Sequence, residues 1–193
     1  MVDGLRPEQE HYRERYNEYK TRLLWELNQT AVIPFVFDEF QHQANMTRLI
    51  LDEVKTGLVL FVEHDTPLVG EIPWRKIGHD ILSDTINLVR FHYDTSIHPE
   101  HKYLMEGNPD GTYLKTRQWS QRPHLARIDH YRKWVGMIAP TSRTMIEDAL
   151  HGPCAEAPWD DWRLAIYHPK GNIQRSLNLD GRGDDPKYEM VYQ

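Results

Sequence analysis

The segment GLVLFVEHD, at residues 57–65, sets the strongest limit on the fold. Residues 58–62 form a continuous apolar run that is rich in β-branched and aromatic side chains. A run of this length is typical of a strand covered on both faces, as in a parallel sheet. The run stops abruptly at Glu63, His64 and Asp65. We therefore predict a buried strand whose carboxyl end carries two acidic residues.

The elements around this strand alternate between helical and extended patterns. Aromatic and leucine residues recur at helical spacing over residues 12–27, which predicts an amphipathic helix that starts near Pro7. Residues 31–37 indicate a short strand or extended segment, residues 39–54 a second helix, and residues 85–92 another strand. Helix, strand, helix and buried strand in this order are typical of an α/β sandwich.

The composition is that of a single soluble domain, predicted to span residues 1–193. The net charge of −6 disfavours duplex DNA as the main contact, although residues 115–133 could form a local basic face. The one cysteine, Cys154, excludes an internal disulfide and a thiolate zinc cluster. We find no secretory signal and no apolar run of the ~20 residues that cross a bilayer, so we predict a cytoplasmic protein without a membrane span.

The acidic residues after the predicted strand suggest a metal site. Side chains alternate along a strand, so Glu63 and Asp65 would point to the same side and could share one cation. Hard divalent ions such as Mg²⁺ and Mn²⁺ prefer oxygen ligands. The alternative interpretation is a strand that simply ends in polar residues.

Four segments of the sequence resemble motifs of GT-A glycosyltransferases of the family 2 type. LVLFVEHDTPL is similar to the apolar strand that leads into the Asp-x-Asp metal motif, here Glu-x-Asp. MVDGLRP resembles the end of an earlier strand at the nucleotide site, and MIEDAL resembles the Glu-Asp motif of inverting members. AIYHP is similar to the later position where some members supply a metal-binding histidine. The chain starts at what resembles the family's second strand, so we expect the first to be missing or supplied by a partner chain.

The resemblance implies a GT-A-like, three-layer α/β/α sandwich with a mostly parallel, Rossmann-like central sheet. It also implies transfer of a sugar from a nucleotide sugar to an acceptor hydroxyl with inversion, assisted by Mn²⁺ or Mg²⁺. Asp148 is then the general base, and Glu63, Asp65 and His168 are the metal ligands. The residues expected at the donor near these motifs are Asp3, Gly4, Arg48 and His64.

Further candidates come from residue chemistry. Arg175, Arg182 and Lys187 lie in a polar tail, residues 171–187, which we predict to be mobile and to close over the donor diphosphate. A structural surface loop is the alternative. The side chains suited to an acceptor are Trp74, Gln121, Arg122, His124 and Glu147, although core packing or a helix entry would explain several of them equally well.

The acceptor is either a glycan or a modified nucleobase in DNA, as in bacteriophage transferases of this type. A second copy of the chain or another chain stays open as a partner. Two other classes of function also stay open. Clustered acids and histidines would serve a metal-dependent hydrolase or nuclease. A transferase remnant that only binds a sugar or nucleic acid would carry the same residues.

Overall fold

The computed structural model describes residues 1–107 and 112–179, which divide into two compact units. Unit 1 comprises Met1–Lys55 and Val135–Ile146, and unit 2 comprises Thr56–Trp134 and the chain from Glu147 onward. Within the described ranges, no helix is both long and apolar enough to cross a membrane. The expected single catalytic domain stays a prediction.

Unit 1 contains the predicted N-terminal helix. A 3₁₀ helix, η1 (Pro7–Tyr12), leads into α1 (Arg13–Leu27), and α2 (Gln43–Leu51) follows within the predicted second helix. The chain before α1 and the chain after it run parallel, joined by bridges from Val2 to Val36 and from Leu5 to Glu39. None of the α1 residues is buried.

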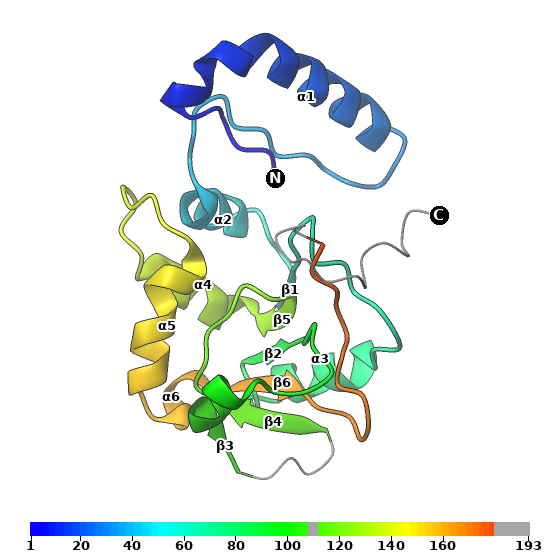
Figure 1. Ribbon diagram of the computed structural model, residues 1–193, viewed down its shortest axis with the longest axis vertical. Coiled ribbons are helices and arrows are strands. Elements are labelled where there is room, and N and C mark those ends of the chain that lie inside the picture. Colours follow the sequence, from blue (N-terminus) through cyan, green and yellow to red (C-terminus); the bar gives the residue numbers. More distant parts are fainter. Residues whose placement is uncertain (108–111, 180–193) are drawn as a thin grey trace. The chain divides into compact units, whose positions relative to one another are not determined.

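The described part of unit 2 contains a mixed sheet of six strands in the order β1-β5-β2-β6-β4-β3 (Figure 1). In chain order the strands are β1 (Leu58–Phe61), β2 (Leu88–Arg90), β3 (Met105–Glu106), β4 (Tyr113–Thr116), β5 (His124–Arg127) and β6 (Leu164–Tyr167). Among the described pairings, only β2 with β6 is parallel. The protein is therefore α/β, but the expected mostly parallel sheet is not confirmed.

The position of β1 corrects the prediction of a strand covered on both faces. In the described sheet β1 lies at an edge and pairs only with β5. Leu60 is 45% exposed, and Val62, just after the strand, is 42% exposed. An apolar run shows that residues can pack, but it does not show whether a second neighbouring strand or a second layer exists to cover them.

Helices pack on both faces of the central strands. On one face, Ile77 and Ile81 of α3 (Trp74–Leu82) share a core with Val89 and Leu125. On the other face, Trp119 contacts an aromatic cluster whose members come from β5, α4 (Ile128–Gly136) and α6 (Trp159–Trp162), namely His124, Tyr131, Trp134 and Trp162. Adjacent residues of β5 thus face opposite sides, as strand geometry requires. The remaining helices are η2 (Pro99–Leu104) and α5 (Ile146–Glu156).

Candidate functional site

The predicted acidic motif lies in a turn rather than on a strand. β1 ends at Phe61, and the backbone N–H of Thr66 donates to the Glu63 carbonyl at 3.2 Å. The Glu63 N–H in turn donates to the Thr66 hydroxyl, also at 3.2 Å. The argument that strand alternation aligns Glu63 with Asp65 is therefore wrong, because hydrogen bonds across the turn set their directions.

The structure brings Glu63 together with two of the residues expected at an acceptor. The Gln121 amide donates from Nε2 to Glu63 Oε1 at 2.9 Å, and its backbone N–H donates to Glu147 Oε2 at 3.1 Å. Sheet geometry explains the first contact, because β1 and β5 are antiparallel and Phe61 pairs with His124. The end of one strand thus lies beside the loop that enters the other. We call Glu63, Asp65, Gln121 and Glu147 the strand-end cluster.

Glu63 is only half-buried, yet its surroundings already disfavour its charge. Burial raises the pKa of the Glu63 carboxyl, and the nearby charge of Asp65 raises it further. The hydrogen bond from Gln121 acts in the opposite direction and stabilises the carboxylate. A cation at this position would remove the repulsion between the two acids.

Asp65 carries the clearest sign of a ligand within the cluster. Within residues 1–107 and 112–179, its buried Oδ1 atom has no hydrogen-bond partner, whereas its backbone carbonyl accepts from the Leu179 N–H at 2.7 Å. A buried polar atom without a partner costs about 1–3 kcal/mol, so such atoms are rare without a reason. A carboxylate oxygen of this kind beside a second carboxylate fits a hard divalent cation.

His168 does not join this pair. It follows β6, which is separated from β1 by β5 and β2, so about 14 Å separates the two strands at ordinary spacing. Metal–ligand bonds are only ~2.0–2.6 Å long. No group of three histidine, cysteine or acidic residues that could hold a metal occurs in residues 1–107 and 112–179.

Two further expected residues of unit 2 have exposed side chains. Asp148 is exposed in the first turn of α5, next to the half-buried Glu147. Trp74 is the first residue of α3, and its ring meets Phe91 edge-on with centroids 5.4 Å apart. The Trp74 side chain is 42% exposed, so it both packs on the core and offers a surface.

His124, another expected acceptor residue, is placed inside the core. It is 1% exposed and stacks on Phe61, with ring centroids 5.1 Å apart. Its Nδ1 lies 2.8 Å from the Arg122 carbonyl and its Nε2 lies 3.0 Å from the Tyr131 hydroxyl. Burial lowers the pKa of His124 to about 4. The structure thus gives His124 a packing role.

The expected donor residues of unit 1 are engaged within that unit. The Asp3 carboxylate accepts from the backbone N–H groups of Gly4 at 2.8 Å, Gln41 at 2.6 Å and His42 at 2.8 Å. A side chain at Gly4 would place Cβ only 2.2 Å from the Glu39 carbonyl carbon, so this close approach requires glycine. Arg48 donates to the Asn45 side chain. These contacts explain Asp3 and Gly4 without a ligand.

The described part of the polar tail runs beside the acidic turn. Leu177 N–H donates to the Pro67 carbonyl at 2.9 Å, and the Arg175 guanidinium donates to the carbonyls of Glu71 and Asn172, each at 3.0 Å. Arg182 and Lys187 lie outside the described residues. The predicted closure of the tail over a donor stays a prediction.

Sequence reasoning missed two residues near Arg122. Arg90 is the last residue of β2, and His92 follows the strand. Both side chains are buried. Arg122 Nη1 lies 2.6 Å from His92 Nδ1. The signal available in the sequence was the charge of Arg90 inside an otherwise apolar strand, since a charge at such a position needs a special environment.

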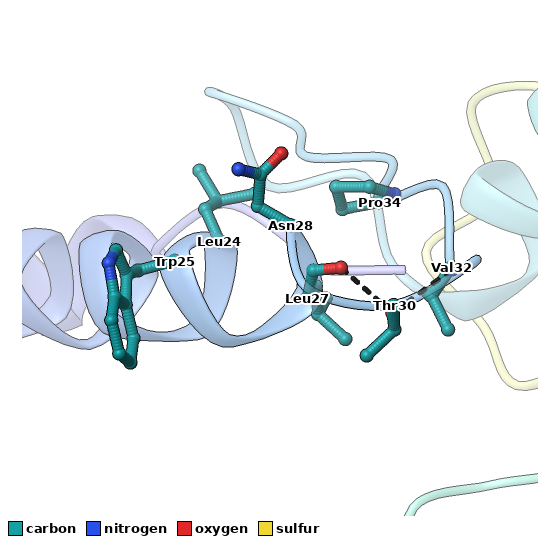
Figure 2. A pocket seen from close by; sticks show the side chains of 7 residues that line it. All are labelled: Leu24, Trp25, Leu27, Asn28, Thr30, Val32 and Pro34. Atoms are coloured by element: carbon teal, nitrogen blue, oxygen red, sulfur yellow. Dashed lines mark hydrogen bonds between the residues drawn. The ribbon is translucent and has the colours of Figure 1, made fainter.

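Unit 1 has a cavity of its own, of about 430 Å³. Figure 2 shows it between the end of α1 and the loop that follows, where Thr30 Oγ1 donates to the Leu27 carbonyl at 2.8 Å. Its lining contains no ionisable side chain: Leu24, Trp25, Leu27, Asn28, Thr30, Val32 and Pro34. The cavity therefore offers no acid, base or metal ligand.

Comparison with known proteins adds no relative. No protein-family model matches the sequence, and no curated protein matches it either. The functional argument thus depends on the strand-end cluster itself.

Proposed function

We propose that unit 2 is the catalytic part of a metal-dependent glycosyltransferase of the GT-A type. The observation that carries the proposal is the buried Oδ1 of Asp65, which has no hydrogen-bond partner among the described residues, beside the half-buried carboxylate of Glu63. These two acids follow the carboxyl end of β1, beside the loop that enters β5, so residues from both segments can meet there.

Glu63 and Asp65 are the residues that would hold Mn²⁺ or Mg²⁺. When bound, the ion would neutralise charge on the diphosphate that leaves with the nucleotide. Gln121 positions Glu63 relative to Glu147, because its side-chain amide donates to Glu63 while its backbone N–H donates to Glu147. Both contacts come from one residue, so the loop before β5 orients acids from two distant parts of the chain.

Asp148 is the proposed general base. Its side chain is exposed, so an acceptor can reach it, whereas Glu147 is turned toward Gln121. Asp148 would take the proton of the acceptor hydroxyl while that oxygen attacks the anomeric carbon. The bond from this carbon to the diphosphate oxygen breaks in the same step. A single displacement inverts the anomeric centre, and the enzyme needs no nucleophile.

The test replaces Asp65 by Asn and, as a matched control, the exposed Asp129 of α4 by Asn. Thermal shift with Mn²⁺ and each common nucleotide sugar measures binding, and release of the nucleotide measures turnover. Asp65→Asn should lose Mn²⁺-dependent binding and turnover and keep its melting temperature without ligand, whereas Asp129→Asn should behave as the wild type.

Several outcomes would contradict the proposal. Unchanged Mn²⁺ dependence in Asp65→Asn would exclude the metal assignment. Cleavage of the substrate without sugar transfer would indicate a hydrolase or nuclease, and binding without turnover would indicate a remnant. Retention of the anomeric configuration, measured by NMR on the product, would exclude Asp148 as the base of a single displacement.

A further inference from the structure

Two arginine side chains near the end of β2 are close enough for their charges to interact, and the first of them is buried without an ion-pair partner in the described structure. Arg90 is 1% exposed. Its Nη1 donates to the Gln118 carbonyl at 3.2 Å and its Nη2 to Gln118 Oε1 at 3.1 Å, while its buried Nε has no partner among the described residues. Both acceptors are neutral, so they satisfy hydrogen bonds but do not balance the charge. Burial lowers the pKa of Arg90 to about 9, and Arg122 adds to this effect, so the guanidinium keeps its charge near neutral pH.

Arg122 is the member of the pair that reaches the surface. Its side chain is 11% exposed, and its guanidinium carbon lies 3.9 Å from the centre of the Tyr93 ring. Nη1 donates to His92 Nδ1, and His92 Nε2 lies 3.2 Å from the Ser96 carbonyl, which assigns the ring proton to Nε2. Burial, together with the two arginines, lowers the pKa of His92 to about 2. His92 is therefore neutral and leaves the Arg122 charge unbalanced.

The counter-charge in this region is weak. Within the described residues, the only carboxylate in ion-pair distance of either guanidinium is that of Asp94, 3.4 Å from Arg122 Nη2. Asp94 is 45% exposed, and a long contact to an exposed acid contributes little. Glu147 acts on Arg90 only from a greater distance, and Gln121 N–H engages its carboxylate. Two buried or nearly buried cations therefore share one poorly placed anion, which is costly.

We propose that the outer edge of Arg122 is a binding site for a phosphate group. A guanidinium edge offers parallel N–H donors that match phosphate oxygens. In this proposal Asp94 occupies the Nη2 edge as an internal substitute that a phosphate displaces. The buried charge of Arg90 raises the affinity for phosphate. Tyr93 and His92 hold the Arg122 guanidinium in place. The site does not depend on the proposed sugar transfer, because it uses neither Glu63 nor Asp65.

The experiment titrates the full chain with inorganic phosphate in EDTA, without nucleotide sugar and at constant ionic strength, and follows binding by calorimetry. Wild-type protein should bind phosphate saturably. Arg122→Gln should weaken binding about tenfold or more, because it removes a charge-assisted hydrogen bond. Asp94→Asn should tighten binding, because it removes the competing carboxylate. The matched control is Arg127→Gln, at the opposite end of β5, where the arginine pairs with Asp84 at 2.9 Å. It should bind as the wild type does.

The opposite sign expected for Asp94→Asn keeps the proposal testable if Arg122→Gln does not fold. Equal binding by wild type and a folded Arg122→Gln would overturn the site. Unchanged or weaker binding by Asp94→Asn would overturn the displacement of Asp94. Acetate that competes as well as phosphate would overturn the phosphate assignment. Since the assay contains no metal, failure of the transferase proposal would leave these results unaffected.

Discussion

Residues 1–42 of unit 1 and the sheet of unit 2 are stabilised by different interactions. In residues 1–42, Gly4 is the only buried residue, and α1 exposes apolar side chains such as Trp25 at 64%. In unit 2, Trp119, Phe91 and Ile81 are each 1% exposed or less. Hydrogen bonds between the chain before α1 and the chain after it therefore stabilise the first region, whereas apolar burial stabilises the second.

The difference also explains where the candidate sites lie. A site needs side chains held by neighbours that do not move, and packed strands supply such neighbours. Glu63, Gln121 and Arg122 all flank strands of the unit 2 sheet. In unit 1, by contrast, the carboxylate of Asp3 is used to bind the unit's own backbone.

The largest expected effect compares two tryptophans. Trp119→Ala removes a buried ring that contacts Tyr131, Trp134 and Trp162, and should lower the free energy of unfolding by about 3–5 kcal/mol. Trp25→Ala removes an exposed ring and should change it by less than about 0.5 kcal/mol. Urea unfolding of both variants measures the difference. Similar losses would contradict the contrast between the two regions.

The next effect is a pH dependence that arises in unit 2. Burial lowers the pKa of His124 to about 4 from 6.5, so below pH 6.5 the unfolded chain binds a proton that the folded chain does not. Stability should therefore fall as the pH decreases, by about 3 kcal/mol in total for this histidine, and level off below pH 4.

His124→Gln should remove this share of the pH dependence, while the buried His92 should still contribute its own. The control is His79→Gln, since the His79 side chain is 80% exposed. Unfolding experiments from pH 7 to pH 4 measure the slope. If the slope of the free energy of unfolding against pH is the same in His124→Gln as in the wild type, the fold does not hold this histidine neutral.

The smallest effect concerns the hydrogen bonds that Asp3 makes within unit 1. Asp3→Ala removes the acceptor for the N–H groups of Gln41 and His42 and should cost about 1–3 kcal/mol locally. The Gln41 and His42 amides should lose protection in hydrogen exchange. The unfolding transition of the region around Trp119 should not change. The exposed Asp38 provides the control variant Asp38→Ala. Unchanged protection at both amides would show that the carboxylate does not stabilise this region.

Local patterns in the sequence predicted local structure well. The spacing of aromatic and leucine residues located α1, and the apolar runs located β1 and β2, because helix and strand periodicity depend on neighbouring residues alone. The sequence also identified Glu63, Gln121 and Glu147 as polar groups of interest. It did not show that Gln121 contacts both Glu63 and Glu147, because that arrangement requires β5 to pair antiparallel with β1.

The sequence by itself located two helices and two strands, α1, α2, β1 and β2, and showed which side chains carry charge. The tertiary structure decided the rest: the edge position of β1, the turn at Glu63, the burial of His124, and the approach of Arg90 to Arg122. The physical reason is that strand order and burial depend on contacts between residues far apart in the chain. A pattern along the sequence records which contacts a residue favours, and only the folded chain selects its partners.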